Sequence, residues 1–95
     1  MPAFSFQMDE AARTLIWEIV HEMMERFQIT EEEAAIRINS RFRGLVLSGD
    51  DIIHHEDAEF WAKDIMFGHN SFWWKNESRA ERIPLDSLPG ESSEH

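Results

Sequence analysis

A helical spacing of apolar residues near the N-terminus constrains the fold more than any other feature of the sequence. Between Asp9 and Gln28, apolar side chains recur at intervals of three and four residues, which places them on one face of a helix. The residues of this face are Ala12, Leu15, Ile16, Ile19, Val20, Met23, Met24 and Phe27. Asp9 is a suitable N-cap, because its carboxylate can accept a hydrogen bond from a free backbone N–H group of the first turn. The sequence therefore predicts a long amphipathic helix that ends near Gln28.

Two shorter helices are predicted further along the chain. Thr30 can cap the first of them, Glu33 can reach back to the Thr30 amide, and Gly44 is a natural C-terminal stop. The apolar stripe of this helix is Ala34, Ala35, Ile38 and Phe42. The next helix covers about residues 57–67, with Gly68 as its stop. Its apolar stripe is Ala58, Trp61, Ala62, Ile65 and Met66.

The length and the cysteine content favour one small core held by apolar packing. The chain has 95 residues and no cysteine, so neither a second core nor a disulfide framework is available. We predict a mainly α domain over residues 1–82, with a three-helix core and a small β-hairpin or irregular insert at residues 45–54; an α+β fold is the alternative. Residues 69–74 fit a short strand or an irregular plug, and residues 83–95 an extended or disordered acidic tail. The predicted core consists of Leu15, Ile19, Met23, Ile38, Phe42, Trp61 and Ile65.

The charge of the chain restricts the class of partner. The formal net charge is -10 at pH 7, which disfavours direct nucleic-acid binding and favours encounter with a basic protein. No apolar run approaches the roughly 20 residues that span a bilayer, and the N-terminus lacks the basic start and apolar stretch of a secretory signal. We therefore expect a cytoplasmic protein without membrane association. Its expected partner is another protein, basic in character, or a second copy of the chain.

Two HExxE motifs, His21 to Glu25 and His55 to Glu59, are the main candidates for metal binding. A His and a Glu four residues apart share one helix face, but a catalytic zinc ion needs three protein ligands, and the HExxH spacing is absent. Solvated polar faces explain both motifs, so we expect no metal and no cofactor. The chain also lacks a cysteine nucleophile, a GxSxG elbow and a glycine-rich phosphate loop. We expect a protein without enzymatic activity.

An apolar anomaly on the third predicted helix points to binding. Phe60 and Phe67 lie nearly opposite the stripe that contains Trp61 and Ile65, so this helix is apolar on two sides. Exposure of these two Phe side chains to water would cost about 1.5–3 kcal/mol each. The second side is therefore covered either by the Trp73–Trp74 segment or by another molecule. The predicted binding surface is Phe60, Phe67, Phe72, Trp73 and Trp74. Small acidic immunity proteins, antidotes and inhibitors work through surfaces of this kind.

Two other groups of side chains are weaker candidates for sites. The first is a small-ligand or metal site, and its residues are His54, His55, His69 and Asn70. It lies beside the aromatic residues, and it requires the rings of His55 and His69 to be close together. The second is the basic cluster Arg37, Arg41 and Arg43. Internal salt bridges such as Glu33–Arg37 explain this cluster, and a carboxylate or phosphate ligand is the alternative.

Four short segments of the chain form a pattern of the type EAxxRIN, HE, WAxxIxxG and WW. The segments are residues 33–39, 55–56, 61–68 and 71–74. In this order they resemble a group of small uncharacterised bacterial proteins, over about residues 30 to 75. Proteins of this group tend to carry tyrosine where this chain has Met66 and Phe67, which puts a role for a phenolic hydroxyl in doubt here. The resemblance implies a bacterial cytoplasmic protein and no known activity.

Overall fold

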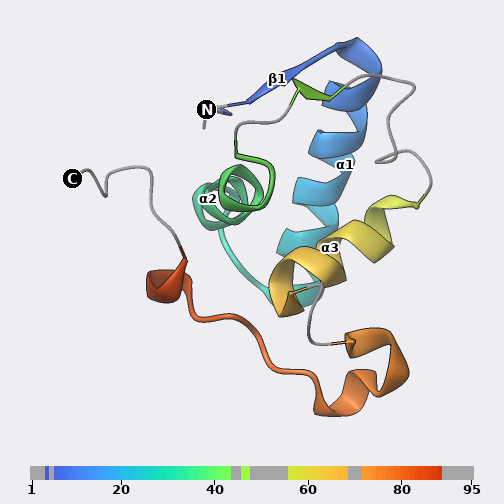
Figure 1. Ribbon diagram of the computed structural model, residues 1–95, viewed down its shortest axis with the longest axis vertical. Coiled ribbons are helices and arrows are strands. Elements are labelled where there is room, and N and C mark those ends of the chain that lie inside the picture. Colours follow the sequence, from blue (N-terminus) through green and yellow to red (C-terminus); the bar gives the residue numbers. More distant parts are fainter. Residues whose placement is uncertain (1–3, 5, 44–45, 48–55, 69–71, 89–95) are drawn as a thin grey trace.

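Three helices build the core of the protein, as predicted. The computed structural model describes residues 4, 6–43, 46–47, 56–68 and 72–88, and Figure 1 draws the other residues in grey. The helices are α1 (Glu10–Phe27), α2 (Glu31–Arg41) and α3 (Ala58–Phe67). Helix α1 packs against both α2 and α3, and the core lies between the three. The seven residues predicted to form the core are all buried: Leu15, Ile19, Met23, Ile38, Phe42, Trp61 and Ile65.

The first helix has the caps that its sequence predicts. The carboxylate of Asp9 accepts a hydrogen bond of 2.9 Å from the backbone N–H of Ala12. At the other end Gln28 adopts a left-handed conformation with φ 57°, and its N–H donates to the carbonyl of Met24. These two contacts satisfy free backbone groups at both ends of α1.

The other two helices begin where predicted, but α2 ends early. The Thr30 hydroxyl accepts a hydrogen bond of 3.0 Å from the N–H of Glu33, while Asp57 caps α3 in the same way. Helix α2 ends at Arg41, ahead of the predicted stop at Gly44, which lies outside the described residues. Helix α3 ends at Phe67, and its C-cap is Gly68, whose φ of 88° is typical of glycine.

A short parallel strand pair lies beside the helices. Strand β1 (Gln7–Met8) pairs with β2 (Val46–Leu47), with Gln7 opposite Val46 and Met8 opposite Leu47. The prediction that β2 is one strand of a hairpin at residues 45–54 is wrong in its pairing, because β2 pairs in parallel with β1, which precedes α1 in the chain. The remainder of the proposed hairpin lies outside the described residues.

The described residues after α3, 72–88, form three short 3-10 turns and an extended connection. The turns are η3 (Trp73–Lys75), η4 (Glu77–Arg79) and η5 (Leu85–Ser87). Residues 72–75 therefore form a compact turn that resembles the predicted plug and not a strand. In Figure 1 the chain passes from η4 across the ends of the helices toward α2.

Ile83 fixes this connection, which we call the strap (residues 80–88), to two helices. Its N–H donates a hydrogen bond of 2.8 Å to the carbonyl of Met66 in α3. Its carbonyl accepts a bond of 2.7 Å from Arg37 in α2. The predicted tail thus begins at an anchored residue, and an extended or disordered tail stays a prediction for residues 89–95, outside the described part.

Candidate functional site

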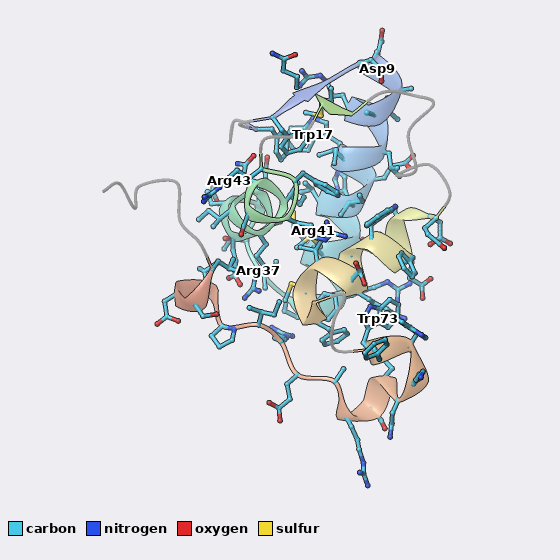
Figure 2. All side chains as sticks on the ribbon, viewed as in Figure 1. Asp9, Trp17, Arg37, Arg41, Arg43 and Trp73 are labelled. Atoms are coloured by element: carbon cyan, nitrogen blue, oxygen red, sulfur yellow. The ribbon has the colours of Figure 1, made fainter. Side chains whose placement is uncertain are left out.

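Trp73 covers the second apolar side of α3. Its ring lies 5.4 Å from the ring of Phe60 and 6.3 Å from that of Phe67, between centroids, and its side chain is only 6% exposed. Figure 2 shows Trp73 between α3 and the turn that carries it. Phe67 also contacts Phe27 of α1, at 5.5 Å. Of the two covers that the sequence leaves open, the intramolecular one therefore accounts for most of the surface of Phe60 and Phe67, which are both partly buried.

A buried carboxylate holds Trp73 in place. Asp64 of α3 is 0% exposed, and its Oδ1 accepts a hydrogen bond of 2.9 Å from the indole N–H of Trp73. Nη2 of Arg41 lies 3.5 Å from the other carboxylate oxygen. A buried charge needs such partners, since its desolvation is costly. Asp64 therefore links the turn η3 to α3 and α2 through side chains.

Phe72 and Trp74, on either side of Trp73, remain exposed. Phe72 is 54% and Trp74 43% exposed, and the centroids of their rings are 5.4 Å apart in an edge-to-face arrangement. Trp74 also contacts the ring of the buried Trp73, at 5.7 Å. We call Phe72 and Trp74 the aromatic pair. Of the five residues predicted for the binding surface, Trp73 forms the cover, Phe60 and Phe67 lie mostly beneath it, and the aromatic pair faces outward.

The backbone at Phe72 adopts a conformation that is costly for a bulky residue. Phe72 has φ 53° and ψ 42°, in the left-handed region. Residues other than Gly, Asn and Asp rarely occupy this region, and the strain is of the order of 1–3 kcal/mol. Phe72 adopts this conformation directly before η3, in which Trp73 is buried and Trp74 exposed.

A chain of surface ion pairs, the ion-pair ladder, borders Trp73 and joins α1, α3 and η4. Its members in order are Glu22, Arg26, Glu59, Lys63 and Glu77. The N···O distances along it are 2.6, 3.2, 2.9 and 3.1 Å. Nζ of Lys63 also lies 5.9 Å from the centre of the Trp73 ring. Charges of opposite sign therefore alternate next to the aromatic cover, with a carboxylate at each end.

The ladder shifts the pKa of its central members. The hydrogen bond from Lys63, followed by the charge of Arg26, lowers the pKa of Glu59 from its usual value. The hydrogen bond to Glu59 raises the pKa of Lys63, and that to Glu22 raises the pKa of Arg26. Because the pKa of Glu59 is lower in the folded state, its stabilising contribution is present at neutral pH and is lost as the pH falls through that pKa.

Internal contacts engage Arg37 and Arg41 of the arginine cluster. Arg37 is 4% exposed, and its Nε donates a bond of 3.0 Å to Glu33, which confirms the predicted Glu33–Arg37 pair. Figure 2 shows Arg37 on the side of α2 that faces the strap. The guanidinium of Arg41 lies over the ring of Trp61 at 5.6 Å, besides its contact with Asp64. Arg43 is exposed.

The residues of the predicted ligand site, His54, His55, His69 and Asn70, lie outside the described part of the chain. Within that part, no group of three or more His, Asp or Glu residues has a geometry that could hold a metal ion. His21 is exposed, as expected for a solvated face. Arg26 forms ion pairs with one glutamate of each HExxE motif, Glu22 of the first and Glu59 of the second.

Asp64 and Ile83 are the contributors to this region that the sequence interpretation missed. Asp64 lies four residues after Phe60 and three before Phe67, and hence at the centre of the second apolar side of α3. A carboxylate in that position, followed by two tryptophans that can donate N–H groups, is a signal of a buried hydrogen bond. Ile83 gives no comparable signal, because its anchoring uses backbone groups.

Comparison of the chain with protein-family models, with curated proteins and with solved structures found no significant match. None of the helices in the described part of the chain is both long and apolar enough to span a membrane.

Proposed function

We propose that this chain is a non-enzymatic, cytoplasmic protein-binding module whose contact surface centres on Phe72 and Trp74. One observation carries the proposal. Two large aromatic side chains in mutual contact, Phe72 and Trp74, are about half exposed, whereas Trp73 between them in the sequence is only 6% exposed. Tryptophan and other aromatic residues dominate the binding energy of protein interfaces, since they bury much area with few rotatable bonds.

The conformation of Phe72 supports a role other than stability. At φ 53°, glycine would fit the backbone with less strain than phenylalanine. The Phe72 side chain is 54% exposed, so little of its surface contributes to the core. The chain thus carries a large apolar group where neither the backbone nor the core requires one, as expected for a contact residue.

The net charge indicates the type of partner. At a formal charge of -10, long-range attraction accelerates encounter with a basic protein, and it opposes association of two copies of the chain. We therefore favour a basic protein over a second copy. Small acidic immunity proteins, antidotes and inhibitors are a functional class that this chain matches in size and charge, by analogy.

A capture experiment with matched variants tests the proposal. The test protein carries Phe72→Gly and Trp74→Ser, changes that remove the aromatic pair while the left-handed backbone at residue 72 is retained. Ile36→Ser is the control, because Ile36 is 50% exposed, like Phe72, but lies on α2. Immobilised wild-type and variant proteins are incubated with bacterial lysate, and the captured proteins are identified by mass spectrometry.

We expect a basic protein that the wild type and the Ile36→Ser control both capture and that the Phe72→Gly, Trp74→Ser protein does not. Circular dichroism must show that all three proteins are folded. The proposal is wrong if the captured proteins and the oligomeric state are the same for all three. It is equally wrong if Ile36→Ser abolishes capture as completely as the aromatic double change does.

A further inference from the structure

The contacts of Lys63 show what kind of group suits the surface beside the aromatic pair. Nζ of Lys63 is bound by Glu59 at 2.9 Å and by Glu77 at 3.1 Å, and it lies over the ring of Trp73 at 5.9 Å. The amine therefore interacts with two carboxylates and with the face of an indole ring. This combination stabilises a cation strongly, because the ring face carries negative potential. The same region presents a second indole, Trp74, which is 43% exposed.

We propose that Trp74 and Glu77 form a binding site for an arginine side chain from a basic segment of the partner. The inference rests on the proposed function and names the chemistry of its contact. The incoming guanidinium would stack on the outer face of the Trp74 indole and pair with the carboxylate of Glu77. It would repeat outside the fold the arrangement that Lys63 makes with Trp73 and Glu77 inside it.

The charges of the ion-pair ladder favour a cation at this end. Three carboxylates and two basic groups form the ladder, and Glu77, 51% exposed in its side chain, is its terminal member near η3. Turns η3 and η4 pack together, and Lys63 joins Glu77 to the Trp73 ring that Trp74 contacts. A cation that pairs with Glu77 would continue the alternation of charges on the turn that packs against the one carrying the aromatic pair.

Guanidinium fits this surface better than an ammonium group. The planar guanidinium stacks on aromatic rings and forms two parallel hydrogen bonds to one carboxylate, whereas an ammonium group acts as a compact and strongly hydrated charge. The protein already places guanidinium groups over aromatic rings, since Cζ of Arg41 lies 5.6 Å from the centre of the Trp61 ring and Cζ of Arg82 lies 5.2 Å from that of Phe27.

Lys75 is the one basic group known to lie on the aromatic pair itself in the described residues. Its Nζ lies over the ring of Phe72 at 5.3 Å. A partner cation therefore meets attraction at Glu77 and repulsion at Lys75. Removal of the negative charge of Glu77 should weaken binding of a cation, and reversal of the positive charge of Lys75 should strengthen it. A non-specific effect of net charge predicts the same two results for any pair of surface residues. The aromatic variant is needed to separate the two explanations.

Calorimetric titration with short oligo-arginine and oligo-lysine peptides of equal length tests the site at near-physiological salt. We expect the wild type to bind oligo-arginine more tightly than oligo-lysine. Trp74→Ala should weaken oligo-arginine binding about tenfold, which corresponds to one desolvated contact between a cation and an indole. Glu77→Gln should weaken it, and Lys75→Glu should strengthen it.

Two controls on α2 separate the proposed site from general effects of a lost apolar or charged surface group. Ile36→Ala removes a half-exposed apolar side chain on α2, and Glu32→Gln removes an exposed carboxylate on α2. Neither should change the affinity as much as the corresponding change at Trp74 or Glu77. Equal affinity of the Trp74→Ala variant and the wild type would refute the site, as would equal binding of the two peptides. If capture of a partner still depends on the aromatic pair in that case, the module function stands and only its arginine chemistry is wrong.

Discussion

Replacement of Trp73 by alanine should destabilise the protein far more than the same change at Trp74. Trp73 is 6% exposed and fills the space between Phe60 and Phe67, so its removal leaves a cavity beside α3. Truncation of a buried Trp to Ala costs about 3–5 kcal/mol. The change also removes the N–H donor to the buried Asp64, and an unsatisfied buried acceptor costs about 1–3 kcal/mol. The total is a large part of the 5–15 kcal/mol typical of a domain.

Trp74→Ala is a closely matched control, because it is the same substitution one residue further along the same turn. Trp74 is 43% exposed, so its loss should cost about 1 kcal/mol, the usual value for a point mutation. Urea unfolding followed by circular dichroism at the helical signal measures both free energies of unfolding without dependence on the tryptophans that are removed. The variants should differ by at least about 2 kcal/mol. Equal values, or a larger cost at Trp74, would refute the assignment of Trp73 as cover and Trp74 as surface.

Three further predictions concern the strap and the ladder. Arg37→Ala should lower the free energy of unfolding by about 1–3 kcal/mol, since it removes the hydrogen bond to the carbonyl of Ile83 and the ion pair with Glu33; urea unfolding measures this. Gly68→Ala should cost about 1–3 kcal/mol in the same assay, because Gly68 has φ 88° and an added Cβ would lie 3.0 Å from Cδ1 of Ile83. Lys63→Met should raise the pKa of Glu59 toward its usual value in an NMR titration, because it removes the main cause of the lowered pKa.

Controls separate these effects from general loss of charge. Arg79→Ala removes an exposed arginine in η4 and should leave stability nearly unchanged. If it costs as much as Arg37→Ala, the hydrogen bond to the strap is not the cause. Arg26→Met should raise the pKa of Glu59 less than Lys63→Met does, since the charge of Arg26 is the second cause of that shift. The reverse order would contradict the geometry of the ladder.

The sequence predicts the helices well because their signals are local. Asp9, Thr30 and Asp57 each lie directly before an apolar pattern of helical period, and each caps its helix in the structure. Gly68 ends α3 as predicted, because glycine adopts a positive φ without steric cost. The end of α2 is the helix boundary that the sequence predicts too late. Phe42 continues the apolar stripe of α2, so the sequence pattern extends one residue beyond the helix, although Phe42 is the C-cap.

The sequence also predicts the apolar second side of α3 but not how it is closed. The cover by Trp73 is accompanied by a left-handed backbone at Phe72, and a left-handed phenylalanine has no sequence signal. The partner of β2 and the anchor of Ile83 are contacts between distant parts of the chain. Backbone groups make the strand pairing and the bond from Ile83 to Met66, and these groups are the same in every residue except proline.

Hydrogen exchange of the tryptophan indole N–H groups, measured by NMR with each signal assigned from a Trp→Phe variant, tests the central assignment most directly. The indole N–H of Trp73 is buried and donates to Asp64, so it should exchange orders of magnitude more slowly than that of a free indole, and the Asp64→Leu variant should lose this protection. Fast exchange at Trp73 in the wild-type protein, at the rate of an unprotected indole, would show that the second side of α3 is open and would contradict the account.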